Sequence, residues 1–363
     1  MKGKFSTLLK TVALVGTIMG LTACNSNKTN STPNSGDVNN NDVDFVIPAE
    51  GFDTTKDVTI KFYTTMGDTL QNVFNAYLDD DFATAYPNIH VDAQFIGGYE
   101  DVRSQMNTEL ASGGTEVNVA YCYPDHIATY NTAKSVVCLD NLINDENYGY
   151  TAAEYNDYVR AFYDEGKTFG DGKMYCLPFS KSTEVMYYNK TFFDANNLQV
   201  PDHWFSSSTQ DTTSLEYVCK RIKEIDIKSI PLGYDSGSNL FITLCEQMGA
   251  QFTSATGNHY LFNNPEAKNF MTKVKGWYDA GYITTKDVYG SYTSGLFTST
   301  EDQKCYLCIG SSAGASYQEP SDGRFEVGIA PIPQANPAHK ACIQQGPDVW
   351  IFQMKDPQKV LAS

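Results

Sequence analysis

The chain has 363 residues and 41% hydrophobic content, enough to form more than one hydrophobic core. Its formal net charge of −17 disfavours nucleic acid and anionic lipid surfaces as partners. Aromatic residues make up 13%, with 24 Tyr against 3 Trp, which suits a site for polar organic ligands. Arginine is scarce, which disfavours a multiply charged anionic ligand, and occurs at Arg103, Arg160, Arg221 and Arg324.

The N-terminus has the features of a lipoprotein signal peptide. Lysines precede an apolar stretch, 12–21, that is shorter than the roughly 20 residues a membrane-spanning helix needs. The stretch ends in Leu-Thr-Ala-Cys at 21–24. We therefore expect 1–23 to be removed and lipids on Cys24 to hold the mature protein on the extracellular face of the membrane. A plain secretory signal with an incidental Cys24 is the alternative.

A polar tether follows Cys24. Residues 25–44 are nearly all Asn, Ser, Thr, Gly and Asp, which cannot bury enough apolar surface to offset their conformational entropy. We expect 24–56 to be disordered and the folded body to begin at 57. The remaining chain, about 300 residues, is more than one core usually holds, so it predicts two lobes.

The first part of the body predicts a parallel sheet with helices on its faces. Alternating and helical apolar patterns predict, in chain order, a strand at 58–63, a helix at 70–82, a strand at 89–96, a helix at 99–110 and a strand at 117–121. The apolar stripe of the first helix contains Leu70, Val73, Phe74, Tyr77, Leu78 and Phe82. Ligands of such sheets gather at the carboxyl ends of the strands, which here are 64–67, 98–100 and 123–125.

A second region begins near Ser182. The pattern predicts strands at 184–188, 305–309 and 325–330 and helices at 191–197, from Ser238 to Gly249, and from a cap at Asn264 to Gly281. The sequence stops where 356–361 begins to look helical, so we expect a further C-terminal portion. Together these elements predict an α/β fold of two hinged lobes, 57–181 plus 305–347 and 182–304 plus 348–363.

The cysteines after Cys24 mostly lie inside apolar runs, so we expect buried small hydrophobic side chains and leave possible disulfides open. The isolated Cys305-x-x-Cys308 pair has no second pair or histidine cluster beside it. We expect no metal and no cofactor.

The segment Gly310–Gly314 matches the Gly-x-Ser-x-Gly elbow of esterases and follows a predicted strand. A triad with Asp322 and His339 would leave little room for the intervening elements of that fold. We therefore interpret the strand end as a source of hydroxyl and backbone N–H groups for a ligand oxygen. A surface hydrolase with paired carboxylates and a surface adhesin remain alternatives.

Two segments carry a family resemblance: 177–193, Leu-Pro-Phe-Ser-Lys-Ser-Thr-Glu-Val-Met-Tyr-Tyr-Asn-Lys-Thr-Phe-Phe, and 325–333, Phe-Glu-Val-Gly-Ile-Ala-Pro-Ile-Pro. From Val58 to Phe352 the chain resembles family 1 of the bacterial extracellular solute-binding proteins. These are lipid-anchored receptors of ATP-binding-cassette (ABC) importers. The resemblance implies a two-lobed, type II periplasmic-binding-protein-like fold similar to maltose-binding protein, no catalysis, and a monomer that passes its solute to the transmembrane subunits of an ABC permease.

Within this family the chain looks closest to the glycerol-3-phosphate and oligosaccharide receptors. The likeness implies ring faces and hydroxyls from Tyr99 and Tyr123, an acceptor from Asp125 and donors from three serines. The whole set of expected ligand contacts is Tyr63, Thr65, Tyr99, Tyr123, Asp125, Ser182, Ser238, Ser311, Ser312 and Gly346. The glycerol-phosphate receptors usually carry two tryptophans after a Gly-Tyr-x-Ser-Gly turn, whereas 233–237 here leads into Ser238 and Phe241. We therefore expect a sugar or polyol, with glycerol-3-phosphate or a glycerophosphodiester as the alternative.

Overall fold

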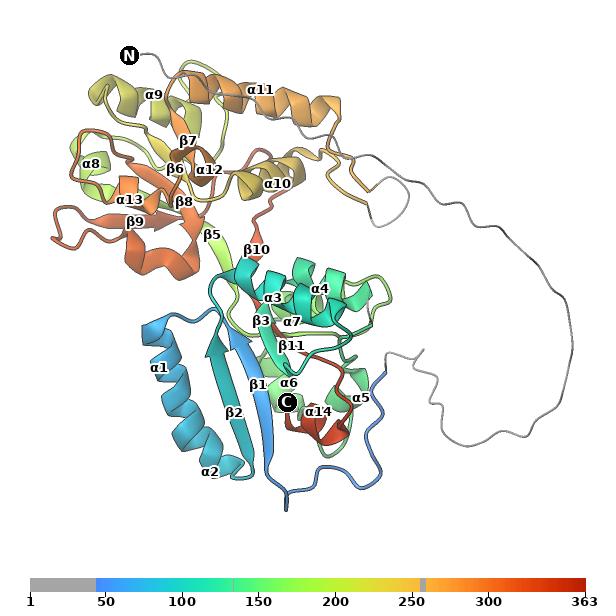
Figure 1. Ribbon diagram of the computed structural model, residues 1–363. Coiled ribbons are helices and arrows are strands. Elements are labelled where there is room, and N and C mark those ends of the chain that lie inside the picture. The colour runs from blue at the N-terminus through green and yellow to red at the C-terminus, as the bar shows by residue number, and fades with distance from the viewer. Residues whose placement is uncertain (1–43, 133, 255–258) are drawn as a thin grey trace, which may run out of the picture. The chain divides into compact units, whose positions relative to one another are not determined.

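The computed structural model describes residues 44–132, 134–254 and 259–363, which contain two mixed β-sheets flanked by helices (Figure 1). The predicted signal peptide and Cys24 lie outside the described residues. Within the described ranges, none of the helices has both the length and the apolar character that crossing a membrane requires. The predicted α/β class is confirmed.

The first sheet has the strand order β2-β1-β3-β11-β4. Its strands are β1 (Val58–Thr64), β2 (Ile89–Phe95), β3 (Val119–Cys122), β4 (Leu177–Pro178) and β11 (Asp348–Ile351). β1 pairs in parallel with β2 and β3, as predicted, while β11 is antiparallel to β3 and β4. The carboxyl ends of β1, β2 and β3 therefore lie along one edge of this sheet.

Helices flank the first sheet, and two of them are fixed to it by a shared buried cluster. The helical segments are α1 (Asp68–Tyr77), a π-helical turn (Leu78–Phe82), α2 (Ala83–Ala85), α3 (Tyr99–Ala111), α4 (Pro124–Thr132), α5 (Asp140–Ile143), α6 (Ala152–Asp157), α7 (Arg160–Glu165) and α14 (Pro357–Ala362). Met106 of α3, Tyr130 of α4 and Trp350 of β11 share a core in which each is at most 1% exposed. This burial fixes α3 and α4, and hence the loops that precede them, against the strand ends.

The helix predicted at 70–82 is present, but its apolar stripe does not face the core. Leu70, Val73 and Tyr77 are 65%, 66% and 52% exposed. α1 packs through Phe74 instead, whose ring centroid lies 5.6 Å from that of Phe62. A helix beside an edge strand has less sheet to cover, so part of its apolar stripe stays outside.

The folded body begins before residue 57. Phe45 is 8% exposed and packs with Val137 and Leu139, and the Asp44 carboxylate lies 2.6 Å from the Lys173 ammonium. The backbone N–H of Phe52 donates to the Tyr148 hydroxyl at 2.7 Å. The prediction that 44–56 is part of a disordered tether was therefore wrong, because one buried aromatic side chain anchors this segment.

The second sheet has the order β10-β5-β8-β6-β7, with β9 paired to β5. Its strands are β5 (Ser182–Asn189), β6 (Leu232–Tyr234), β7 (Ile283–Thr285), β8 (Leu307–Ser311), β9 (Val327–Ala330) and β10 (Gln344–Gln345). β6, β7 and β8 run parallel, while β5 is antiparallel to β8, β9 and β10. The start of β5 thus meets the carboxyl end of β8.

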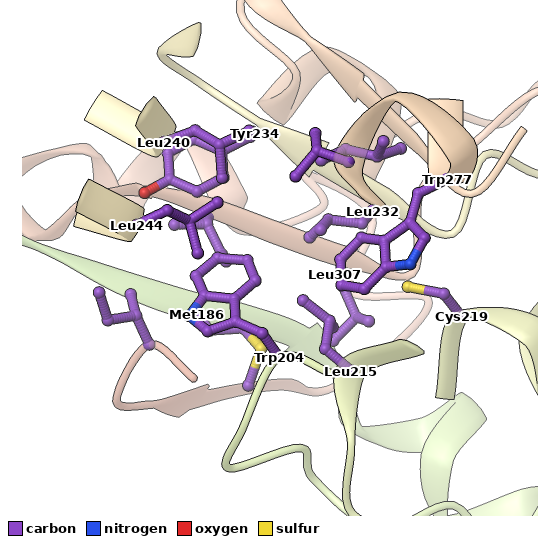
Figure 2. Close-up of a cluster of buried hydrophobic side chains, with 14 of the residues drawn as sticks. Met186, Trp204, Leu215, Cys219, Leu232, Tyr234, Leu240, Leu244, Trp277 and Leu307 are labelled. Atoms are coloured by element: carbon purple, nitrogen blue, oxygen red, sulfur yellow. The ribbon is translucent and has the colours of Figure 1, made fainter. Parts of the chain in front are cut away.

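The second sheet carries a large apolar core on the face covered by α9, α10 and α11 (Figure 2). Its helical segments are α8 (Lys190–Ala195), α9 (Leu215–Ile225), α10 (Gly237–Met248), α11 (Pro265–Asp279), α12 (Lys286–Tyr289), α13 (Ser294–Phe297) and a 3-10 helix (Ser312–Gln318). Asn264 caps α11, as predicted. α10 ends at Gly249 as predicted, but its N-terminal cap is Ser236, which accepts from the N–H of Asn239, and not Ser238.

The strand pairings differ from the expected grouping of the C-terminal segments. β8 and β9, within 305–347, pair with β5 in the second sheet, and β11, within 348–363, pairs with β3 in the first. The two segments were therefore assigned to the wrong sheets. The described chain passes between the sheets at 179–181 and again at 346–347.

The prediction of buried cysteines is confirmed for most positions. Seven of the described cysteines are buried and unbridged: Cys122, Cys138, Cys176, Cys219, Cys245, Cys305 and Cys308. Burial raises the pKa of the Cys305 and Cys308 thiols, so this pair remains protonated and packs as small apolar side chains. Cys342 is the exposed exception.

Candidate functional site

Four aromatic side chains gather at the strand ends of the first sheet, and we call Tyr99, Tyr121, Tyr123 and Phe179 the tyrosine group. The ring centroids of Tyr99 and Tyr123 are 4.5 Å apart, and those of Tyr99 and Tyr121 are 6.1 Å apart. Phe179, which follows β4 and is 46% exposed, lies edge-on to Tyr121 at 5.3 Å. The structure therefore brings the predicted Tyr99 and Tyr123 together, and adds Tyr121 and Phe179, which the sequence interpretation missed.

Local chain geometry places Tyr99 within this group. Gly98 precedes α3, and its N–H donates to the carboxylate of Asp101 at 2.7 Å, so the first turn of α3 is closed. Tyr99 is the first residue of that helix, and Tyr123 follows β3 directly. The two rings therefore come from the carboxyl ends of β2 and β3, the strands on either side of β1.

The hydroxyls of Tyr121 and Tyr123 are neutral over the physiological pH range. Burial raises the pKa of Tyr123, and the nearby hydroxyls of Tyr99, Tyr121 and Tyr292 raise it further. Burial also raises the pKa of Tyr121. Tyr292, from the segment between α12 and α13, is 59% exposed. The group consequently offers uncharged ring faces with hydroxyl donors, which is the chemistry that sugar C–H faces and hydroxyls complement.

Asp125 lies next to the tyrosine group but points toward solvent, since its side chain is 82% exposed. The neighbouring His126 is 5% exposed, and its Nε2 is 3.8 Å from a carboxylate oxygen of Glu100 and 4.0 Å from one of Asp125. Burial lowers the pKa of His126 although both carboxylates act against this. The imidazole is therefore neutral at pH 7.

Three predicted serines meet at the junction of β5 and β8, and we call Ser182, Ser311 and Ser312 the serine group. Ser311 Oγ donates to Ser182 Oγ at 3.0 Å, and Ser312 Oγ accepts from the N–H of Thr183 at 3.3 Å. The antiparallel register sets this meeting, because Glu184 lies opposite Ser311. The group offers hydroxyls at one edge of the second sheet.

A buried acid lies on the same strand, at Glu184, which is 3% exposed. One carboxylate oxygen accepts from the Tyr234 hydroxyl at 2.5 Å and the other from Asn239 Nδ2 at 2.9 Å. Asn239 Nδ2 also donates to Gln345 Oε1 at 3.1 Å. Burial raises the pKa of Glu184, against the lowering effect of its two donors. The sequence interpretation missed this network; its signal was a charged residue inside an otherwise apolar strand pattern.

Gly346 lies where the second connection passes between the sheets. Its φ of 106° is in the left-handed region, and an added Cβ would collide with the backbone carbonyl of Ser180 and lie 2.7 Å from Lys181 Cα. Lys181 Nζ donates to the Gly346 carbonyl at 2.7 Å and also contacts the carboxylates of Glu165 and Asp348. The predicted Gly346 is thus a backbone crossing point, and Lys181 was missed.

Three predicted residues are not brought into these groups. Tyr63 is 6% exposed, and its hydroxyl donates to Glu109 at 2.8 Å, with burial and that hydrogen bond raising its pKa to about 12. Ser238 is exposed in the first turn of α10, and Thr65 is half-buried directly after β1. Tyr63 has a packing role in the first core, with no free hydroxyl.

The cations near these strand ends all have partners. Lys181 is bound by two carboxylates, Arg103 pairs with Glu100, and the Lys286 ammonium lies 3.8 Å from the ring centroid of Tyr292. Across the described ranges, no group of three or more His, Cys, Asp or Glu is arranged to hold a metal ion.

The esterase interpretation gains no support from the geometry. The Asp322 carboxylate binds the guanidinium of Arg324 through both oxygens, at 2.9 and 3.0 Å. His339 is exposed in a turn, and in the part of the chain that the structure describes no hydrogen bond joins it to Ser312. Ser312 instead opens the 3-10 helix and accepts from the β5 backbone.

The chain is similar in sequence to known binding proteins. Residues 77–363 match the family model described as bacterial extracellular solute-binding protein. The sn-glycerol-3-phosphate-binding periplasmic protein UgpB of Shigella flexneri serotype 5b (strain 8401) is 25% identical over 322 residues, which cover 83% of this chain and 67% of that protein.

Two solved structures show the same fold. The ABC substrate-binding protein Lmo0181 of Listeria monocytogenes, in complex with cycloalternan, is 18% identical with a TM-score of 0.66 and covers 84% of this chain and 73% of its own. UgpB of Mycobacterium tuberculosis, in complex with glycerophosphocholine, is 19% identical with a TM-score of 0.63 and covers 84% and 73%. The predicted maltose-binding-protein-like fold class is confirmed, and these relatives are binding proteins. This chain belongs to the bacterial extracellular solute-binding proteins, the solute receptors of ABC importers.

Proposed function

We propose that this protein is a lipid-anchored, non-catalytic receptor that captures a neutral carbohydrate or polyol and delivers it to the transmembrane subunits of an ABC permease. The observation that carries the proposal is the pairing of neutral ring faces with hydroxyl and amide groups. Tyr99 and Tyr123 supply the rings at one edge of the first sheet, and the serine group supplies hydroxyls at an edge of the second sheet. Sugar C–H faces pack on tyrosine rings, and sugar hydroxyls exchange hydrogen bonds with serine and amide groups.

The proposed cycle is closure of two lobes about the connections at 179–181 and 346–347. A ligand shifts an open–closed equilibrium only through its differential affinity for the two states, so the closed state must add contacts from the second sheet to those of the first. The protein acts as a monomer and returns its ligand unchanged.

The test is a binding screen on the soluble body, from residue 44 onward, by thermal shift and titration calorimetry. The panel contains maltose, maltotriose, cyclic oligosaccharides, mannitol, glycerol, glycerol-3-phosphate and glycerophosphocholine. We expect a neutral member to raise the melting temperature and to compact the protein in small-angle scattering. Stabilisation that the substitutions Tyr99→Ala and Ser312→Ala leave unchanged would contradict this site.

Glycerol-3-phosphate or a glycerophosphodiester is the second candidate, supported by the similarity to the sn-glycerol-3-phosphate-binding protein. Lys286 is the cation best placed to bind the phosphate of such a ligand, since its ammonium lies against the ring of Tyr292. A phosphate ligand predicts that Lys286→Met abolishes binding, whereas a neutral ligand predicts that binding persists. Catalysis is tested in the same samples, because products formed from glycan or ester substrates and lost in Ser312→Ala would replace the receptor proposal.

A further inference from the structure

We infer that Glu184 is a positioning residue that orients the side-chain amides of Asn239 and Gln345, so that together they offer a ligand hydroxyl one acceptor and one donor. This inference rests on the proposed function and names the chemistry of that site more closely. It concerns residues that the family resemblance did not single out.

The first step concerns Asn239, whose amide has two N–H donors and one carbonyl acceptor. Its Nδ2 is 2.9 Å from Glu184 Oε1 and 3.1 Å from Gln345 Oε1. Both oxygens are acceptors, so both N–H groups are used. Among the described residues none donates to Asn239 Oδ1, and this carbonyl is left as an acceptor.

The second step concerns Gln345. Its Oε1 accepts from Asn239, which leaves Nε2 as a donor that no residue of the described ranges engages. Gln345 lies opposite Ser182 in the antiparallel ladder, so their side chains share one face of the sheet. Ser182 is in turn hydrogen-bonded to Ser311. The free donor of Gln345 is therefore adjacent to the serine group.

The third step explains why the orientation is fixed. Ionised Glu184 can only accept hydrogen bonds, and Tyr234 occupies one of its oxygens at 2.5 Å. Because Glu184 is 3% exposed, water does not replace Asn239 at the other oxygen. A flipped Asn239 would place its carbonyl against the carboxylate and leave a buried acceptor unsatisfied, which is unfavourable.

The resulting acceptor and donor match a hydroxyl group, which both donates and accepts, and two such groups on adjacent carbons can use both amides. A phosphate dianion has acceptors only, so it would meet the Asn239 carbonyl unfavourably. The network therefore favours a neutral ligand with neighbouring hydroxyls over an anionic one.

Gln345→Glu tests the donor. Glutamate retains an acceptor for Asn239 but replaces the Nε2 donor with a second acceptor. We expect the affinity for the best neutral ligand of the panel to fall about tenfold, as for loss of one hydrogen bond to a ligand, with little change in the unfolding midpoint. Gln344→Glu is the matched control on the same strand: it makes the same change in charge, and its Nε2 donates to the Ala161 carbonyl. Equal affinities for the two variants would overturn the inference.

A pair of changes at Glu184 tests the positioning role. Glu184→Gln keeps an acceptor toward Asn239 and can donate to the Tyr234 hydroxyl, so affinity should remain within about threefold of the original. Glu184→Ala frees the Asn239 amide, and affinity should fall about tenfold or more. A conservative variant that fails to retain binding would contradict positioning as the role.

A ligand-free measurement separates this inference from the proposed function. Hydrogen exchange of the Asn239 side-chain amide, followed by NMR, should be slow for both protons in the unmodified protein and in Glu184→Gln, and fast in Glu184→Ala. Fast exchange in the unmodified protein overturns the inference whatever binds. If the whole panel fails to bind, the proposed function fails, while slow exchange still supports the fixed amide.

Discussion

Lys181 Nζ lies 3.2 Å from Asp348 Oδ2; Lys181 belongs to the first connection between the sheets, and Asp348 begins β11 directly after the second. Both side chains are almost fully buried, at 3% and 0% exposed. Lys181 also binds Glu165 and the carbonyl of Gly346, so one ammonium ties together both crossing segments and α7. Any bending between the sheets must accommodate this ion cluster.

The buried cluster predicts that stability decreases as pH rises from about 4 to 7. Burial raises the pKa of Asp348 to about 7 from an ordinary 3.8; Lys181 opposes this, and Glu165 adds to it. The folded protein thus holds the proton more tightly than the unfolded chain, so the contribution is complete below the unfolded pKa and is lost as pH passes the folded pKa. Urea unfolding of the protein and of Asp348→Asn at several pH values measures this contribution of Asp348 to the free energy of unfolding.

In that experiment the Asp348→Asn variant should lose the part of the pH dependence that lies between pH 4 and 7. Asp79→Asn, at an exposed acid of the π-helical turn, is the control and should leave the profile unchanged. Identical profiles for the protein and for Asp348→Asn would show that Asp348 titrates as it does in the unfolded chain.

Gly346→Ala should lower the free energy of unfolding by about 1 to 3 kcal/mol, because the position has φ of 106° and no room for a Cβ against Ser180. The matched control is Gly276→Ala in α11, where no atom lies within 4 Å of an added Cβ. That change should raise the free energy of unfolding by about 0.5 to 1 kcal/mol. Chemical denaturation of both variants measures the change in the free energy of unfolding. A change of the same sign in both variants would contradict the crossing geometry at Gly346.

Tyr99→Ala should weaken binding of the best panel ligand about tenfold, because it removes the ring at the centre of the tyrosine group. Tyr123→Phe keeps the ring and removes the hydroxyl, so the loss should be smaller. Tyr86→Ala, at a 52% exposed tyrosine that packs on Phe82, controls for removal of a surface ring. Calorimetry on the three variants decides, and equal losses for Tyr99 and Tyr86 would move the site elsewhere.

His203 should stabilise the loop around it more at low pH than at high pH. Burial opposes its charge, but hydrogen bonds to Asp202 and Asp211, at 2.6 and 2.9 Å, outweigh burial and raise its pKa above 6.5. The contribution is present below pH 6.5 and disappears as pH rises through the raised value. The destabilisation caused by His203→Gln should be larger at pH 6 than at pH 9, and equal destabilisation at the two pH values would contradict the raised pKa.

Cys24→Ser should convert a membrane-bound protein into a released one, because the substituted residue has no thiol to carry a lipid. Fractionation and labelling with an alkyne fatty acid measure this. Retention of label in the variant would show that the lipid is attached at another residue. A substitution at Ser26 gives the matched control, with anchoring unchanged.

Local pattern was enough to predict most elements of the fold. Apolar alternation gave β1 and β2 to within a residue of their ends, and Asn264 marked the start of α11, because these features depend on neighbours in sequence. The pairing of β8 and β11 depends on contacts across long stretches of chain, and nothing local states which sheet a short apolar strand will join. The segments 305–347 and 348–363 were accordingly exchanged.

The residues of the candidate site also fall into those that the sequence could predict and those that it could not. Tyr99 and Tyr123 could be placed together because strand ends of the first sheet converge, whereas the serine group lies at strand ends of the second sheet. Glu184 and Lys181 were missed because a charge inside a strand or a crossing segment appears ordinary until its burial is known. Tyr63 was expected among the ligand contacts, but the alternation of the strand turns its hydroxyl toward Glu109.

Cys342 is an exposed cysteine that offers a natural site for attaching a fluorescent probe. Its sulfur lies 3.0 Å from the Thr183 hydroxyl, and Thr183 donates its N–H to Ser312, whereas the other described cysteines are buried. In a soluble version that starts after Cys24, a thiol-reactive fluorophore would attach selectively at position 342. Solute capture could then be followed as a change in fluorescence emission, without introducing a cysteine by substitution.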